Sequence, residues 1–471
     1  MFKDFNSFKK NTALINEKNE KISYELLNNF IDIFAKKIKK RSLIFLICKN
    51  NLESIVGYIG SIWANAVVAL INQKKNIKLL RILIKKYEPD FIFLDKNENI
   101  KIKNYNSMFS FLDYELIKSK RYRQKKLHNN LIQLISTSGS TGTSKFVRQS
   151  KKNIENNTES IARYLKINDN DNTITTLPMS YVYGLSIINT HLYRGGTIVL
   201  NNYSIIQKNF WISLQQNKIT NFGGVPYIYS MLDKINLNNY DLRHLNYTTL
   251  AGGKLHKTII KRIIKKYKSQ NIKLQIMYGS AEATARMSFL PWNKIEKKIE
   301  SIGKPIPGGK FFLEDEYFNK INTENKIGEL VYVGKNVSMG YSNNYKDLGH
   351  PDINRGILKT GDMAYKDKEN YYYLVGRKDR YIKVFGLRIN LQELEDIISE
   401  YGYENMCLQE SENKIDIFLK KIVNQNIFKN YLTNLTNLHN SVFNIKVIKK
   451  FPLNSNFKIS YDRELLKIWM T

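Results

Sequence analysis

Residues 137–145 read Thr-Ser-Gly-Ser-Thr-Gly-Thr-Ser-Lys, and the apolar run Leu-Ile-Gln-Leu-Ile stands just before them at 131–135. The apolar run predicts a buried strand. The loop combines glycines, which allow positive φ and a close approach of backbone N–H groups, with hydroxyl donors and the charge of Lys145. A buried strand that opens into such a loop predicts a binding site for a polyanion such as a chain of phosphates.

The spacing within this loop excludes two common functional loops. A Walker loop has glycine directly before its lysine and serine or threonine after it, whereas Lys145 lies between Ser144 and Phe146. A nucleophile elbow needs glycine two places away on both sides of its serine, and neither Ser138 nor Ser140 has this. A flexible linker is the remaining alternative, although linkers rarely follow buried strands.

Apolar periodicity on both sides of the loop predicts helices and strands in alternation. Residues 24–38, 52–69 and 79–87 have helical spacing, and residues 43–48 and 91–94 are expected to form buried strands. Similar rounds follow over 153–200 and from about 221 onward. This alternation is typical of an α/β fold with a mainly parallel sheet.

The length of 471 residues predicts two or more domains. From about residue 310 the pattern becomes rich in short strands, and the residues after Gly386 resemble a small α+β unit. The charged run Arg-Lys-Asp-Arg at 377–380 is a plausible exposed joint. We therefore predict a large domain over 1–379 and a small one over 380–471, with the boundary near Asp379.

The formal net charge of +32 admits a nucleic-acid or anionic-membrane partner. The lysines are spread along the chain and form no stripe with interleaved aromatic residues, so biased codon composition explains the charge more simply. No specific nucleic-acid partner is expected.

The chain is expected to be cytoplasmic. Cys48 and Cys407 cannot form a disulfide framework, which favours a reducing compartment. The first residues lack the apolar core of a signal peptide, and the longest apolar stretch, 57–71, is too short to span a bilayer. No transmembrane segment is predicted.

An ordered series of short motifs resembles the adenylate-forming (AMP-binding) superfamily, which includes acyl-CoA synthetases, the adenylation domains of peptide synthetases, and firefly luciferase. The loop matches the family pattern Thr-Ser-Gly-Ser/Thr-Thr-Gly-x-Pro-Lys, except that Ser144 replaces the proline. The further matches are Tyr-Gly-Ser-Ala-Glu at 278–282, Ser-Ile-Gly-Lys-Pro at 301–305, Gly-Glu-Leu at 328–330, Gly-Tyr at 340–341, Thr-Gly-Asp at 360–362, Gly-Arg-Lys-Asp-Arg at 376–380, and the stretch from Pro452 to Lys458.

The resemblance covers nearly the whole chain and implies both a fold and a reaction. The fold would have a large N-terminal domain of parallel-sheet α/β subdomains with a strand-rich part, and a small mobile α+β domain that rotates about the segment near Asp379. The reaction would be an ATP-dependent, AMP-forming ligation of a carboxylic acid to a thiol, with Mg²⁺ as cofactor and pyrophosphate as the first product.

The resemblance also implies which residues bind ATP. The phosphate loop would use Thr137, Ser138, Gly139, Ser140, Thr141, Gly142 and Lys145. Glu282 would bind Mg²⁺, with Thr141 as a second ligand. Adenine would lie against Tyr278, with Gly279 and Ser280 beside it and Gly252 and Gly253 as bare backbone. Asp362 would accept hydrogen bonds from the ribose, assisted by Arg377.

Two lysines would alternate in the site as the small domain rotates. Lys458 would bridge the carboxylate and the α-phosphate during adenylation, although Phe457 replaces the usual glycine before it. Lys383 and Gly386 belong to the loop expected to face coenzyme A, since a glycine lets a pantetheine arm pass close to the backbone. An exposed, inert lysine and a simple hairpin turn are the respective alternatives.

The acyl pocket is expected to be lined by Tyr181, Gly223, Val225 and Met287. Amino-acid-activating relatives often carry an aspartate near this point that pairs with the substrate ammonium. This chain has no aspartate between Asp171 and Asp233. The substrate is therefore expected to be a carboxylic acid without an α-amine.

Several alternatives stay open at this point. The thiol acceptor is coenzyme A or the phosphopantetheine of a carrier protein, and a positive surface would suit an acidic carrier. A catalytically degenerate nucleotide- or RNA-binding protein is suggested by Ser144, Phe457 and the basic composition. Glu282 could instead be a carboxylate at a helix N-terminus, and Tyr278 a core tyrosine.

Overall fold

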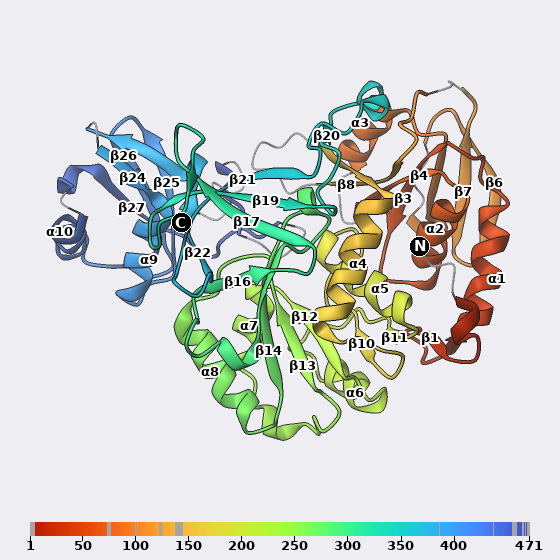
Figure 1. Cartoon of the computed structure of the whole chain (residues 1–471), viewed down its shortest axis with the longest axis horizontal. Helices are drawn as coiled ribbons and strands as arrows, with labels where there is room; N and C mark the ends of the chain where they lie inside the picture. The colour runs from red at the N-terminus through yellow and green to blue at the C-terminus, as the bar shows by residue number, and fades with distance from the viewer. Residues whose placement is uncertain are drawn as a thin grey trace. The chain divides into compact units, whose positions relative to one another are not determined.

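The computed structural model describes residues 5–72, 77–98, 100, 102–121, 125–136, 145–385, 387–436, 438–454, 459–463, 466 and 468. The chain forms two compact units. The first unit comprises Met1–Lys310 and Tyr332–Leu358, and the second comprises Phe311–Val331 and Lys359–Thr471. Helices and sheets are mixed in both, which confirms the predicted α/β class with an additional strand-rich part (Figure 1).

The first sheet of the first unit has eight strands in the order β20-β9-β8-β4-β3-β5-β7-β6. Its centre is parallel and consists of β3 (Leu43–Cys48), β4 (Val67–Asn72), β5 (Phe91–Asp95) and β8 (Leu131–Ser136). Its flanks are antiparallel and consist of β6 (Tyr105–Phe111), β7 (Tyr114–Ser119), β9 (Phe146–Ser150) and β20 (Tyr341–Ser342). Every residue of β3, β4 and β5 is buried, as expected for strands covered on both faces.

The second sheet of this unit also has a parallel centre. In this unit the strands run in the order β16-β15-β14-β13-β12-β10-β11-β1-β2. The parallel strands are β10 (Asn172–Ile174), β11 (Thr197–Val199), β12 (Asn221–Gly224), β13 (Tyr247–Leu250) and β14 (Lys273–Tyr278), and β1 (Thr12–Ile15) is parallel to β11. Antiparallel strands complete it: β2 (Lys21–Ser23), β15 (Ser288–Leu290) and β16 (Ser301–Pro305).

Helices connect and cover these strands. Helix α4 (Lys151–Leu165) contacts β8 and β9, helix α5 (Val182–Arg194) contacts β10 and β11, and the two helices pack together between the sheets (Figure 1). The other helices of the unit are α1 (Tyr24–Ala35), α2 (Leu52–Trp63), α3 (Ile77–Tyr87), α6 (Lys208–Gln216), α7 (Pro226–Leu232) and α8 (Lys257–Lys268). The predicted helix over 52–69 was wrong at its end, because Asn65 adopts a left-handed conformation (φ 54°) and the chain then enters β4.

The second unit contains the strand-rich part and the chain's C-terminal residues. Its first strands are β17 (Gly309–Glu314), β18 (Lys320–Ile321), β19 (Gly328–Gly334), β21 (Ile357–Lys366) and β22 (Tyr372–Arg377). The first residues of β17 and β21 and the last of β19 lie in the first unit. They are followed by the hairpin β23 (Tyr381–Val384) and β24 (Leu387–Asn390), and by a sheet of β25 (Asn405–Ser411), β26 (Lys414–Leu419) and β27 (Phe443–Val447). Helices α9 (Leu391–Glu400) and α10 (Gln425–Thr436) bury residues in the core of this unit.

Arg380 is fixed to the C-terminal residues by a buried ion pair. Its Nη2 lies 2.8 Å from Glu395 Oε1 and also donates to the Cys407 carbonyl, and its guanidinium lies 4.2 Å from the ring centre of Tyr461. The predicted domain boundary near Asp379 is a hinge about which the small domain would rotate. A division into compact units does not test such a rotation, so this boundary stays a prediction.

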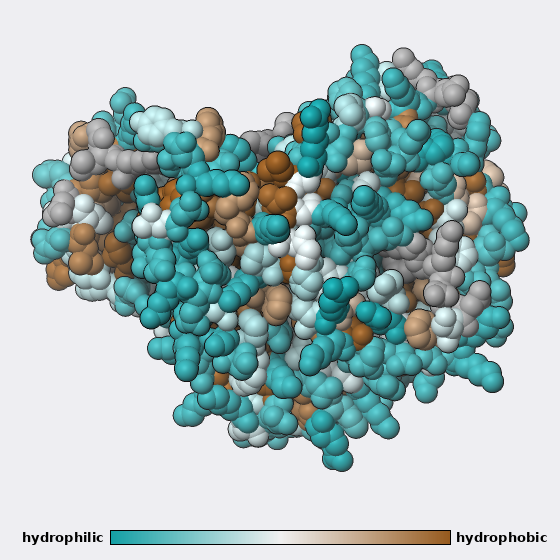
Figure 2. Space-filling view, in the orientation of Figure 1, coloured by the Kyte–Doolittle hydropathy of each residue, from teal (hydrophilic) through white to brown (hydrophobic). Residues whose placement is uncertain are grey.

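Within the described ranges, no helix combines the length and apolar character that crossing a membrane requires. Hydrophilic side chains cover most of the face shown in Figure 2.

His191 on α5 is buried in the neutral form. Asn221 Nδ2 donates to its Nε2 over 3.1 Å, so the imidazole proton is on Nδ1 and is donated to the Ile187 carbonyl over 2.9 Å. The pKa of His191 is lowered from 6.5 to about 4, mainly by burial; the charge of Arg286 acts in the same direction, and the hydrogen bond to Ile187 and the charge of Asp171 oppose it.

We expect this histidine to make the first unit less stable in mild acid. Below pH 6.5 the unfolded chain binds a proton that the folded chain does not, so stability from this group is lost as pH falls from 6.5 toward 4, by roughly 2 kcal/mol at pH 5. Thermal unfolding at pH 7 and pH 5 should show a larger fall for the natural chain than for His191→Gln. An equal fall in both proteins would contradict this assignment.

Candidate functional site

The carboxyl ends of β12, β13 and β14 bring together most of the residues predicted to bind adenine and the acyl group. The three strands are parallel neighbours, with Gly224 paired to Leu250 and Leu250 paired to Ile276. Gly223 and Val225 therefore lie at the end of β12, Gly252 and Gly253 follow β13, and Tyr278 through Glu282 end and follow β14. Ligands of open α/β sheets bind at such edges.

The segment after β14 makes a tight turn that requires Gly279. Thr284 and Ala285 both have positive φ, 62° and 146°. A Cβ on Gly279 would stand 1.8 Å from the Ala285 carbonyl oxygen. No side chain fits there, so the close approach of these two backbone stretches fixes the position of the intervening Glu282.

The chain after β19 holds this turn from a second side. Asn336 Nδ2 donates to the carbonyl oxygens of Ala283 (2.8 Å) and Arg286 (3.2 Å), and Ser338 N donates to the Glu282 carbonyl over 2.8 Å. Neither Asn336 nor Ser338 was predicted as a site residue, and no local sequence signal marks them.

Glu282, Tyr341 and Lys145 form a contact cluster that joins the two sheets. The Tyr341 hydroxyl donates to Glu282 Oε1 over 2.7 Å, and Lys145 Nζ lies 3.9 Å from the centre of the Tyr341 ring. Glu282 Oε2 has no hydrogen-bond partner among the described residues. Two residues predicted separately for the site, Lys145 and Glu282, thus contact the same tyrosine. The Gly-Tyr motif at 340–341 was the sequence signal for that tyrosine.

Buried Arg148 fixes the segment that carries Tyr341. Its guanidinium donates to four backbone carbonyls, those of Met339 (2.6 Å), Tyr341 (3.1 Å), His350 (2.6 Å) and Pro351 (3.1 Å). Burial lowers the pKa of Arg148. This positioning residue was also missed, because a single arginine within a short buried strand does not reveal its distant partners.

The four predicted acyl-pocket residues lie around α5, β12 and β15. Met287 and Val225 are buried, and Met287 N donates to the Tyr278 carbonyl over 2.8 Å. The Tyr181 ring lies 6.2 Å from that of Tyr183. A Cβ on Gly223 would stand 2.6 Å from Ile187 Cδ1, 3.0 Å from the Tyr183 hydroxyl and 3.1 Å from Thr249 Oγ1, so a larger residue there would require these side chains to shift.

In the second unit, strand register pairs the two residues predicted to bind ribose. Asp362 lies opposite Arg377 in the antiparallel pair β21–β22, and Arg377 Nη1 is 3.3 Å from Asp362 Oδ1. Arg377 Nε lies 3.3 Å from Asp379. Lys383 is exposed on β23.

Several predicted site residues lie outside the described residues, namely Thr137, Ser138, Gly139, Ser140, Thr141, Gly142, Gly386 and Lys458. Their roles stay predictions.

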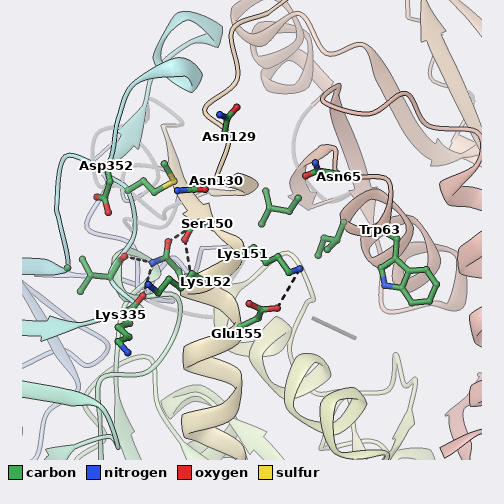
Figure 3. Close-up of a pocket in the computed structure, with 16 residues that line it drawn as sticks. Trp63, Asn65, Asn129, Asn130, Ser150, Lys151, Lys152, Glu155, Lys335 and Asp352 are labelled. Atoms are coloured by element: carbon green, nitrogen blue, oxygen red, sulfur yellow. Dashed lines mark hydrogen bonds and ion pairs between the residues drawn. The ribbon is translucent and has the colours of Figure 1, made fainter. Parts of the chain in front are cut away.

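A pocket of about 1010 Å³ lies near the start of β8, at the end opposite to the one that leads into the predicted phosphate loop (Figure 3). It is lined by Ile132 at the start of β8 and Ser150 at the end of β9, and by Lys151, Lys335 and others. Here Asn153 Nδ2 donates to the carbonyls of Lys335 and Val337. Because the predicted phosphate loop follows the opposite end of β8, this pocket is not the predicted nucleotide site.

Comparisons with known proteins agree on one family. The sequence model of the AMP-binding enzymes matches residues 2–342. Luciferin 4-monooxygenase of Photuris pensylvanica is 25% identical over 407 residues, which is 78% of this chain and 72% of that protein. The 2-succinylbenzoate–CoA ligase of Oceanobacillus iheyensis is 25% identical over 414 residues, 84% of this chain and 83% of that protein.

Two solved structures show the same fold. The o-succinylbenzoate coenzyme A synthetase of Bacillus subtilis, in complex with ATP and magnesium, aligns with a TM-score of 0.79 and 20% identity over 99% of this chain and 98% of that one. ATP-bound MatB of Rhodopseudomonas palustris aligns with a TM-score of 0.81 and 17% identity, again over 99% and 98%.

Proposed function

This chain belongs to the family of AMP-binding enzymes, and on that premise we propose that it converts a carboxylic acid, ATP and coenzyme A to an acyl-CoA, AMP and pyrophosphate. The observation that carries the proposal is the cluster of Lys145, Tyr341 and Glu282. It places the cation of Lys145, the last residue of the predicted phosphate loop, and the carboxylate of Glu282 against the same tyrosine, and one Glu282 oxygen has no hydrogen-bond partner among the described residues.

The proposed reaction has two steps. A carboxylate is a poor electrophile because its charge resists attack and oxide is a poor leaving group. A carboxylate oxygen first attacks the α-phosphorus of ATP, and pyrophosphate leaves. The thiol sulfur of coenzyme A then attacks the acyl carbon of the acyl-AMP, and AMP leaves. The protein must hold the phosphates, neutralise charge and align the reacting atoms.

We assign the roles as follows. Residues 137–142 and Lys145 hold the β- and γ-phosphates. Tyr278 stacks on adenine, while the backbone of Gly252, Gly253, Gly279 and Ser280 lines its edge. Asp362 accepts hydrogen bonds from the ribose hydroxyls, and Arg377 holds Asp362. Lys458 neutralises the α-phosphate during adenylation, and Lys383 with Gly386 accompanies the pantetheine arm in the second step.

Glu282 is a suitable ligand for Mg²⁺. The ion prefers oxygen donors and is often held by one or two carboxylates together with substrate phosphates. Glu282 Oε1 is engaged by Tyr341, and Oε2 is available among the described residues. Bound there, Mg²⁺ would neutralise charge on the phosphates; Thr141 is the second proposed ligand.

Glu282→Gln is expected to raise the Mg²⁺ concentration for half-maximal adenylation by about 10-fold or more. The reason is the loss of an anionic ligand with little change in shape. A Mg²⁺ titration of hydroxamate formation measures this shift. Glu155→Gln, which changes a carboxylate on α4, is the control. An unchanged titration would remove Glu282 from the metal site.

Product analysis tests the proposed function. The enzyme is incubated with ATP, Mg²⁺, hydroxylamine and each acid of a broad panel, and we expect AMP and an acyl hydroxamate with at least one acid. Formation of ADP and phosphate, or AMP without dependence on acid, would contradict it.

The thiol acceptor has one competing candidate. The net charge of +32 would favour an acidic carrier protein bearing phosphopantetheine. Turnover with free coenzyme A and with holo-carrier protein distinguishes the two; faster turnover with the carrier would replace coenzyme A in the proposal.

A further inference from the structure

Arg286 is a buried cation next to the predicted acyl pocket. It is 2% exposed, and no carboxylate of the described residues lies within ion-pair distance of its guanidinium. Its Nη1 donates to the Tyr164 hydroxyl over 3.3 Å, and its Cζ lies 5.0 Å from the Tyr183 ring centre. Its Nε is buried and has no hydrogen-bond partner in the described part of the chain.

A guanidinium in this position needs an anion. Arginine keeps its proton in proteins, so it cannot become neutral as a buried lysine can. An unpaired buried charge costs several kcal/mol, and a hydroxyl and an aromatic face offset only a part of this. Asp171, whose charge acts on His191, does not supply the anion: its carboxylate accepts from Thr220 Oγ1 and Asn168 N.

Other unsatisfied polar atoms lie on the same side of the sheet. Within the described ranges, the buried side-chain polar atoms that lack a hydrogen-bond partner include Arg286 Nε, the Tyr247 hydroxyl and Gln275 Oε1. Tyr247 and Thr249 are two positions apart on β13 and therefore share a face of the sheet, and Thr249 pairs in register with Gln275 on β14. The charge of Arg286 acts on the Tyr247 hydroxyl. Buried polar atoms are normally satisfied, so this grouping indicates a polar ligand.

The same contacts connect Arg286 to the predicted acyl pocket. Tyr183, whose ring faces the guanidinium, donates through its hydroxyl to the Thr249 carbonyl over 2.8 Å and lies against Gly223. Met287, another predicted pocket residue, follows Arg286 directly. The charged group therefore lies beside the space assigned to the acyl chain.

We propose that Arg286 binds a second anionic group of the acid substrate, and that this substrate is a dicarboxylic acid. The inference rests on the proposed function, because it presumes that one carboxylate is activated by ATP. The second carboxylate would accept hydrogen bonds from the guanidinium of Arg286 and from the Tyr247 hydroxyl. A buried cation also disfavours a substrate ammonium at this position.

A comparison of matched acids tests this in the natural enzyme. Each dicarboxylic acid from succinate to suberate, and each benzenedicarboxylate, is compared with its monomethyl ester, which keeps the length and removes one charge. Acid-dependent ATP–pyrophosphate exchange should give the best diacid a kcat/KM at least about 100-fold above that of its monoester. Equal values, or a preference for monoesters, would overturn the dicarboxylate proposal and leave the proposed function intact. If no acid of the panel supports exchange, both the dicarboxylate proposal and the proposed function are overturned.

Two variants then test the role of Arg286 itself. Arg286→Met should lower kcat/KM for the diacid about 100-fold, mainly through KM, and lower that for the monoester much less. Arg286→Lys should keep part of the preference. Arg163→Met, which removes an exposed arginine of α4, is the control. An equal loss for diacid and monoester in Arg286→Met would show a purely structural role and overturn the assignment. If Arg286→Met does not fold, the diacid–monoester comparison in Arg286→Lys and in the natural enzyme tests the assignment instead.

Discussion

Gly279→Ala is expected to reduce adenylate formation by about 100-fold or more. The new methyl group would stand 1.8 Å from the Ala285 carbonyl oxygen and 2.7 Å from Arg286 Cα. Both neighbours are backbone atoms within a turn that already has two residues at positive φ, so the turn must move. Glu282 lies within that turn, and a displacement of about 1 Å is enough to misalign a catalytic group. Steady-state exchange and thermal unfolding measure the two consequences.

Gly308→Ala provides the matched control for this prediction. Gly308 also has a positive φ (85°), but no atom lies within 4 Å of the position of its Cβ. Alanine there costs about 1–2 kcal/mol of conformational strain without a clash. It should therefore lower stability slightly and retain activity. Comparable loss of activity in both variants would show that the close approach at Gly279 has no special part in the site.

Lys458→Ala is expected to nearly abolish the first half-reaction, by about 100-fold or more, and to spare the second. The proposed role of its ammonium is to neutralise charge that develops between the carboxylate and the α-phosphate. Thioester formation from supplied acyl-AMP does not include that step. The two half-reactions are measured separately, as pyrophosphate exchange and as release of AMP from acyl-AMP and coenzyme A.

Lys449→Ala is the control for this lysine. Lys449 is exposed and lies near Lys458 in the sequence, so its removal changes the local charge equally. It should leave both half-reactions intact. Equal loss of the two half-reactions in Lys458→Ala would mean that the lysine or its role is wrongly assigned. Phe457, in place of the usual glycine, makes this a test of the least typical motif in the chain.

The fold class was predictable because its signals are local. Apolar runs such as 43–48 and 91–94 form buried strands as expected, and the βα alternation predicted the parallel centre of both sheets of the first unit. The exact end of α2 was not predictable from periodicity, since apolar residues continue into β4 and only Asn65 separates the two elements.

The candidate site was predictable to the extent that it resides in motifs. The resemblance named Glu282 and Lys145, and it paired Asp362 with Arg377, which strand register places opposite each other. The residues that hold these groups could not be named. Tyr341 and Glu282 are 59 positions apart, and Asn336 and Ala283 are 53 apart. Such partners depend on tertiary packing, which no local pattern encodes.

Arg286 is a further residue whose role could not be predicted from the sequence. In the sequence it is one of 74 basic residues and carries no distinguishing signal. Its burial between α4, α5 and the second sheet, with Tyr164 and Tyr183 as its neighbours, separates it from the exposed lysines. The charge that we propose for substrate choice, that of Arg286, is thus identified by its buried surroundings and not by the amino-acid composition.

Acid-dependent exchange of labelled pyrophosphate into ATP is the decisive measurement for the proposed function, because it reports acyl-AMP formation without requiring the thiol acceptor. We expect exchange that needs Mg²⁺ and a carboxylic acid, and that is lost in Gly279→Ala and Lys458→Ala. Absence of exchange across the full panel of acids, or exchange that persists in both variants, would contradict it.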